Sequence, residues 1–165
     1  QGLKIHHTAT HLLHASLRNI VGKHISQKGS FVGSNSLRFD FNSSGALSSD
    51  SLQQIEDSIN NIIYKNAKVT TELKNIEEAK LEGAICLFGD KYEDIVRVIK
   101  VVQEQTLFSV ELCGGTHVAS TSEIFLFKIT SEKSIASGIR RIEAVCGKYA
   151  LQEYQKSDLC LNKII

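Results

Sequence analysis

The chain has 165 residues, of which 42% are hydrophobic and 22% are charged, a composition typical of one folded domain with a buried core. Its formal net charge of +1 excludes a strong overall positive field for attracting nucleic acid, so any such contact would need a local patch. No run of eighteen apolar residues occurs, and we therefore expect no membrane-spanning helix.

The first half of the chain predicts two helices separated by a pair of strands. Apolar residues recur at helical spacing over 3–25. Short strands are expected at 31–33 and 37–41, and strict alternation in the second indicates that one of its faces is buried. Ser48 or Ser49 would cap the second helix. The apolar stripe of that helix consists of Leu52, Ile55, Ile59, Ile62 and Ile63.

The second half of the chain predicts most of the sheet. A short acidic helix at 75–81 would end near Gly83, and the tail at 148–161 is predicted to be helical. Helices and strands are mixed without strict βαβ alternation, so we predict an α+β fold. In this fold a mostly antiparallel sheet packs with the long N-terminal helix and the further helices. The strands of this half are expected at 68–73, 92–102, 107–112, 124–131 and 139–145.

The cysteines and the absence of methionine bear on where the protein works and how long it is. The four cysteines have irregular spacing without a C-x-x-C pair, which favours reduced thiols in an intracellular protein over a disulfide framework. The sequence contains no methionine, so we expect it to be a piece of a longer chain. The cysteines are Cys86, Cys113, Cys146 and Cys160.

Two short motifs predict a metal site. His7 and His11 are four residues apart, a spacing that places both side chains on one helix face. Cys113 and His117 lie at the two ends of a Gly-Gly turn, which can fold the end of a strand back toward one point. Three imidazoles and one thiolate suit zinc. The alternative, a buried cysteine beside a surface histidine, leaves the Gly-Gly turn unexplained, so we predict a metal site between helix and sheet.

Two further histidines flank the first motif. His14 shares a helix face with His7 and is expected to support the site or to pack beside it. His6 faces elsewhere and is expected to be exposed to solvent. Four protein ligands would close a tetrahedral zinc shell, which is typical of structural sites, whereas catalysis needs an open position or a displaced ligand. The residues alone do not decide between these two uses.

With these motifs in place, the chain resembles the editing domain of alanyl-tRNA synthetase and the free-standing relatives of that domain. The resemblance rests on His-Thr-Ala-Thr-His-Leu-Leu at 7–13 and Cys-Gly-Gly-Thr-His at 113–117. The threonyl-tRNA synthetase editing domain shares both zinc motifs, but Leu-Arg-Phe-Asp-Phe at 37–41 favours the alanyl family. The similarity covers nearly the whole chain, with further blocks at 27–30, 78–80, 83–84, 87–92 and 138–145.

The resemblance implies one editing domain over 1–165 that ends in a C-terminal helix and comes from a longer, cytoplasmic, ATP-binding synthetase. The implied reaction is hydrolysis of the ester that joins serine or glycine to alanine tRNA, with Zn²⁺ as cofactor. Its implied partners are the acceptor end of that tRNA and the remaining synthetase domains. Such a second site destroys errors that the alanine-binding site cannot exclude.

The resemblance also implies roles for residues around the zinc ligands His7, His11, Cys113 and His117. Thr10 and Gln27 are the expected catalytic groups, because a partner for the serine hydroxyl would stay unpaired with alanine. The alternatives are a Thr10 hydroxyl bonded to its own helix and a surface Gln27. Backbone N–H groups of Gly114 and Gly115 are expected to bind substrate and support an oxyanion. Zinc could activate a water or hold the substrate.

Contact with tRNA is expected to be weak. Adjacent arginines on a strand point to opposite faces, so one of the pair at 140–141 is expected to bind Glu143 or Asp40 internally. A binding module with structural zinc remains the second hypothesis. A zinc hydrolase of unrelated specificity is disfavoured, because His-Glu-x-x-His is absent. The candidates for phosphate contact are Lys23, Lys28, Arg38, Arg140 and Arg141.

Overall fold

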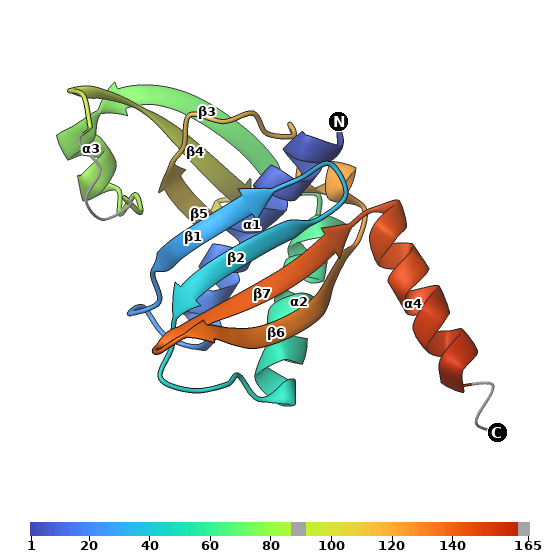
Figure 1. Cartoon of the computed structure of the whole chain (residues 1–165). Helices are drawn as coiled ribbons and strands as arrows, with labels where there is room; N and C mark the ends of the chain where they lie inside the picture. The colour runs from blue at the N-terminus through green and yellow to red at the C-terminus, as the bar shows by residue number, and fades with distance from the viewer. Residues whose placement is uncertain (87–91, 162–165) are drawn as a thin grey trace.

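The computed structural model describes residues 1–86 and 92–161, and these form an α+β fold with two antiparallel sheets (Figure 1). The strand order is β1-β2-β7-β6 in the larger sheet and β3-β4-β5 in the smaller one. The predicted class is confirmed, with the strands divided between two sheets. The elements are α1 (Gly2–Ile20), β1 (Gln27–Val32), β2 (Leu37–Asn42), α2 (Ser49–Tyr64), β3 (Lys68–Asn75), α3 (Ile76–Leu81), β4 (Ile95–Gln103), β5 (Thr106–Leu112), the 3₁₀ helix η1 (Thr121–Ile124), β6 (Phe127–Ala136), β7 (Ile139–Cys146) and α4 (Lys148–Leu161).

Helix α1 is the element that both sheets share. It contacts β5 of the smaller sheet, β1, β2 and β7 of the larger sheet, and α2. As a result, the middle of α1 is buried on all sides, polar residues included. The helix ends at Ile20, earlier than the predicted residue 25. Gly22 follows with φ of 148°, a conformation that a glycine adopts readily and that stops the helix.

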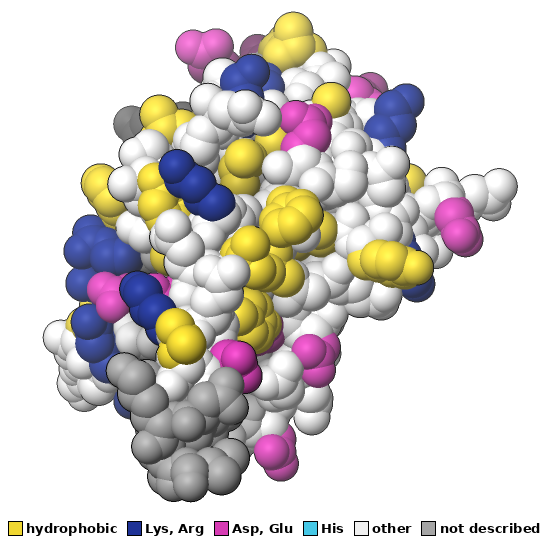
Figure 2. Space-filling model, turned by 90° about the vertical axis from the view of Figure 1, so that its right-hand side faces the viewer, with side chains coloured by type: hydrophobic (Ala, Val, Ile, Leu, Met, Phe, Trp, Pro, Cys, Tyr) yellow, Lys and Arg dark blue, Asp and Glu magenta, His cyan; other side chains and the backbone are white. Residues whose placement is uncertain are grey.

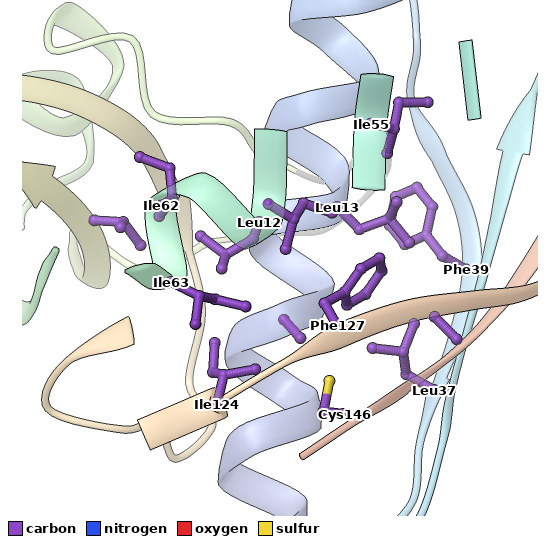
Figure 3. Close-up of a cluster of buried hydrophobic side chains, with 14 of the residues drawn as sticks. Leu12, Leu13, Leu37, Phe39, Ile55, Ile62, Ile63, Ile124, Phe127 and Cys146 are labelled. Atoms are coloured by element: carbon purple, nitrogen blue, oxygen red, sulfur yellow. The ribbon is translucent and has the colours of Figure 1, made fainter. Parts of the chain in front are cut away.

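The core lies between the larger sheet and the two helices that cover it (Figure 3). Leu37, Phe39 and Phe41 of β2 alternate with outward-facing polar residues, so the predicted alternation is confirmed. Leu12 and Leu13 of α1 point into the same core, where they meet isoleucines of α2 (Figure 3). Ser48 accepts a hydrogen bond from the N–H of Ser51, which confirms the cap expected for α2.

The strands β6 and β7 complete the larger sheet, and helix α4 follows them. The predicted strand at 124–131 begins later, at Phe127, because η1 and Phe125 with φ of 70° occupy its start. The predicted C-terminal helix is confirmed as α4, which extends from the body of the molecule beside β6 and β7 (Figure 1).

Hydrophobic side chains gather in the middle of the face shown in Figure 2. No helix among the described residues has the length and apolar character needed to cross a bilayer.

Glu56 joins three elements at the base of α4. Its carboxylate is only 3% exposed and accepts hydrogen bonds from the Ile129 N–H at 2.8 Å and the Tyr154 hydroxyl at 2.7 Å. Lys128 Nζ lies 3.0 Å from the same carboxylate and supplies the opposite charge. A buried carboxylate needs such partners, because burial removes its hydration. Glu56 therefore connects α2 with β6 and α4.

Replacing Glu56 with Ala should lower the free energy of unfolding by about 1–3 kcal/mol, because the Ile129 N–H and the Tyr154 hydroxyl lose their acceptor. Urea denaturation followed by circular dichroism measures this change. Asp57→Ala is the matched control, since Asp57 is exposed, and its effect should stay within about 0.5 kcal/mol. Equal effects of the two substitutions would contradict the structural role of Glu56.

Candidate metal centre

The fold brings the two motifs together at one end of β5. His7 and His11 come from α1, Cys113 follows the last residue of β5, and His117 lies in the next loop. One ligand atom from each of the four residues lies within 4.8 Å of the others. The Nε2 atom of His7 is 3.3 Å from the Sγ atom of Cys113. This group could hold a metal ion, and it lies between helix and sheet as predicted.

The unused nitrogens of two histidines test whether the group fits a metal. The Nδ1 atom of His11 is 2.9 Å from a carboxylate oxygen of Glu111, and its Nε2 atom is buried without a hydrogen-bond partner among the described residues. In His117, Nδ1 lies 3.3 Å from the Thr8 hydroxyl, and Nε2 is again buried and unpaired in this part of the chain. Buried polar atoms rarely lack a partner, and a metal ion would supply one to both nitrogens.

Thr8 fixes which nitrogen of His117 carries the proton. The Thr8 hydroxyl donates its hydrogen to the carbonyl of Lys4 at 3.0 Å, so it can only accept from the Nδ1–H of His117. It also accepts from the N–H of Val118 at 3.2 Å. The lone pair of His117 is therefore on Nε2, the nitrogen that remains for a metal.

The Cys-Gly-Gly turn depends on two contacts. A Cβ atom at Gly115 would overlap the ring of His7, so only glycine allows this approach, whereas a Cβ at Gly114 would meet open space. Arg97 of β4 donates Nη1–H bonds to the carbonyl oxygens of Cys113, at 2.8 Å, and of Gly115. The N–H of Cys113 donates to the carbonyl of Arg97 at 3.0 Å. Arg97 therefore holds the turn from the smaller sheet, a role that sequence reasoning missed.

The charges of the metal-free site favour a thiolate. Burial would raise the pKa of the Cys113 thiol, but the facing imidazoles of His11, His117 and His7 lower the pKa to about 3. Burial would also lower the pKa of His11, but the Glu111 carboxylate and the Cys113 sulfur outweigh it and raise the pKa to about 10. A thiolate next to imidazoles is the form of cysteine that binds zinc and related metals.

The residues expected to select the substrate form hydrogen bonds within the chain. Thr10 is 4% exposed, and its hydroxyl donates to the carbonyl of His6 at 2.8 Å, the local bond considered as its alternative. Two lone pairs of that hydroxyl remain as acceptors. Gln27 begins β1, and its side-chain amide donates to the hydroxyl of Ser30 at 3.1 Å. The N–H of Gly115 points to the sulfur of Cys113 at 3.5 Å. The catalytic and substrate-binding roles of these residues stay predictions.

The basic residues expected to contact tRNA mostly have partners within the chain. Arg141 forms two bonds with the carboxylate of Asp40, at 2.7 and 2.9 Å, which is the internal pair expected for one of the adjacent arginines. Arg140 is paired as well, with Glu132. The guanidinium of Arg38 lies 5.1 Å from the ring centre of Phe31, and Lys23 donates to Asn19. Lys28 is exposed on β1. Their role in tRNA binding stays a prediction.

The expectation that His6 faces solvent is wrong. Its side chain is 1% exposed, because the end of β7 covers this side of α1. Its Nδ1–H donates to the carbonyl of Gly2 at 2.8 Å, and its Nε2 accepts from the N–H of Cys146 at 3.2 Å. His14 lies next to the group, with its Nδ1 3.2 Å from Glu111, and its supporting role stays a prediction. Glu111 itself was missed, although it lies two residues before Cys113 on the same strand face.

Comparisons with known proteins relate the chain to aminoacyl-tRNA synthetases. Residues 96–143 match the family described as "Threonyl and Alanyl tRNA synthetase second additional domain". The chain is 49% identical over 164 residues to the alanine–tRNA ligase of Rickettsia rickettsii (strain Sheila Smith). It is 50% identical, over the same length, to those of Rickettsia bellii (strain RML369-C) and Buchnera aphidicola subsp. Baizongia pistaciae (strain Bp).

The resemblance to the editing-domain region of alanyl-tRNA synthetase is confirmed. Each of these alignments covers 99% of this chain, and the chain spans 18% of the length of each relative. The segment 96–143 contains Cys113, and the longer alignments extend over α1 as well. The likeness to alanine–tRNA ligases therefore includes both halves of the candidate metal centre.

Replacing Gly115 with Ala should lower the affinity of this site for Zn²⁺ at least about tenfold, because the added methyl group displaces the ring of His7. Competition with a chromophoric chelator measures the affinity. Gly114→Ala is the matched control, since its methyl group would enter open space, and it should bind Zn²⁺ like the unmodified chain. Equal affinities of all three proteins would show that His7 does not need this approach.

Removing metal should make Cys113 a more reactive thiol than Cys86 and Cys146. Its pKa is lowered, whereas burial raises the pKa values of Cys86 and Cys146, and thiolates are the form that iodoacetamide alkylates. Mass spectrometry of peptides would measure the alkylation rate of each cysteine at pH 7 after chelation and after addition of Zn²⁺. Zinc should protect Cys113. Alkylation of Cys113 that is no faster than that of Cys86, or that ignores Zn²⁺, would argue against the site.

Proposed function

We propose that this chain is the editing unit of an alanyl-tRNA synthetase and hydrolyses the ester of serine-charged and glycine-charged alanine tRNA. The observation that carries the proposal is the convergence of His7, His11, Cys113 and His117 in a chain that resembles alanine–tRNA ligases over 99% of its length. The cofactor would be Zn²⁺, held by these four residues. The partners would be the tRNA acceptor end and the other domains of a cytoplasmic synthetase.

Selection of serine follows from the hydrogen-bonding capacity of Thr10. Its hydroxyl hydrogen is already donated to His6, so it offers lone pairs to a ligand. The serine side chain brings an O–H donor, and alanine brings none. A site that bonds this hydroxyl discriminates against the analogue that lacks it, because a buried polar group is then left unpaired. Gln27 would add a second polar contact from the start of β1.

Ester hydrolysis requires a placed water and support for the oxygen that becomes negative. Bound Zn²⁺ would supply a Lewis acid to this site. The N–H of Gly114 is the backbone donor of the turn that we assign to the ester oxygen, because the N–H of Gly115 faces sulfur. Arg97 would keep the turn in place through the carbonyls of Cys113 and Gly115.

A second candidate function is a module that only grips the acceptor stem. It is favoured by the number of protein ligands, because four such groups close a tetrahedral zinc shell and closed shells are usually structural. The two candidates differ in one measurable way: only the first hydrolyses the ester. They also differ in what Thr10 does, since a structural zinc site has no use for a serine-binding hydroxyl.

Deacylation of serine-charged alanine tRNA should proceed with the unmodified, zinc-loaded chain, and alanine-charged tRNA should be spared. Cys113→Ala should slow the reaction at least about 100-fold, the size expected for losing an electrostatic group at the reacting centre. Thr10→Val should slow it while zinc stays bound, and Thr106→Val, on the exposed start of β5, should not. Release of labelled serine measures the rates.

The outcomes separate the two candidates. Hydrolysis that continues in Cys113→Ala would overturn the assignment of the site. A well-folded, zinc-loaded chain that binds the tRNA but leaves serine attached would establish the gripping module instead.

A further inference from the structure

Glu111 of β5 is a buried carboxylate shared by two histidines. It is 5% exposed, and its Oε2 atom lies 2.9 Å from Nδ1 of His11 and 3.2 Å from Nδ1 of His14. Its other oxygen, Oε1, accepts a hydrogen bond from the Ser109 hydroxyl at 3.2 Å. Both oxygens of this carboxylate are therefore used inside the protein.

The contact with Glu111 determines the form of His11. An ionised carboxylate only accepts hydrogen bonds, so Nδ1 of His11 must carry a hydrogen. The lone pair of the neutral ring then lies on Nε2, which is buried and unpaired among the described residues. His14 differs from His11 in one respect, because it contacts Glu111 without belonging to the group of four ligand residues.

The placement of Glu111 follows from the way side chains repeat along a strand and along a helix. Ser109, Glu111 and Cys113 are two residues apart and face α1 together, since side chains alternate along a strand. On α1, His11 and His14 lie about one turn apart on one face. The end of β5 therefore places Glu111, and Cys113 directly after the strand, next to α1.

We propose that Glu111 is a positioning residue of the metal centre, which holds His11 with Nε2 directed at the metal and uses His14 as a second anchor. The inference rests on the zinc site of the proposed function. A carboxylate behind a metal-bound imidazole fixes the orientation of the ring and increases its basicity, and loss of such a partner typically costs about 10–100-fold in metal affinity.

The test is the Zn²⁺ affinity of Glu111→Gln, measured on the whole chain by competition with a chromophoric chelator. The expected result is a loss of about 10–100-fold. Ser109→Ala is the matched control, because it removes a contact from the same carboxylate without touching a histidine, and its loss should be smaller. The change in the ¹⁵N shifts of the His11 ring on addition of Zn²⁺ should also be smaller in Glu111→Gln, which a role confined to stability would not cause.

Each outcome decides the proposal. Zinc affinity of Glu111→Gln within about twofold of the unmodified chain would overturn it and leave the zinc site standing. An unmodified chain that binds no Zn²⁺ would overturn both this inference and the proposed function. If Glu111→Gln does not fold, Glu111→Asp keeps the charge but withdraws it from His11, and undiminished affinity there would equally reject the role.

Discussion

Helix α1 carries four histidines and is buried between two sheets, where imidazole nitrogens need partners. Most of these nitrogens have one, but Nε2 of His11 and Nε2 of His14 are buried without a hydrogen-bond partner among the described residues. His6 uses both nitrogens for backbone groups, at Gly2 and Cys146. His14 and His11 share Glu111 through Nδ1. Nε2 of His11 faces the group that includes Cys113 and His117, where a metal ion would be its partner.

The two sheets contribute different parts of this solution. The larger sheet supplies the hydrophobic surface on which α1 packs, with Phe39 and Phe41 at its centre. The smaller sheet supplies polar groups: Glu111 from β5, Cys113 directly after that strand, and Arg97 from β4, which holds the Gly-Gly turn. This division places the ligands on elements that are fixed by packing or by backbone hydrogen bonds, which favours a preorganised site.

Local signals in the sequence were sufficient for much of the fold. The apolar stripe and the serine cap predicted α2, and alternation predicted β2, because these features depend on residues close in sequence. The burial of His6 could not be predicted, since it depends on Cys146, 140 residues away. The predicted start of β6 was wrong for a related reason. Phe125 adopts a φ of 70°, and the sequence has no glycine at this position to indicate such a conformation.

The candidate site likewise has residues that local sequence patterns predict and residues that only the structure reveals. The four residues that could hold a metal were predictable because each pair has a local spacing, but the contacts of Arg97 and Glu111 join separate elements and required the structure. Glu111 could have been found from the sequence, because side chains alternate along a strand and the residue two positions before Cys113 should share its face. Arg97 has no such signal, because its contact with Gly115 crosses from β4 to a turn eighteen residues later.

The hydrogen-bond donors near the metal centre are largely used, and this bears on what can bind there. The hydroxyl of Thr10 donates to His6, and the N–H of Gly115 is directed to the sulfur of Cys113. What the Thr10 hydroxyl retains is acceptor capacity, in its two lone pairs. A complementary ligand must therefore bring a hydrogen-bond donor to it. In the proposed substrate the seryl ester has such a donor in its side-chain hydroxyl, whereas the alanyl ester has no hydroxyl from which Thr10 would accept.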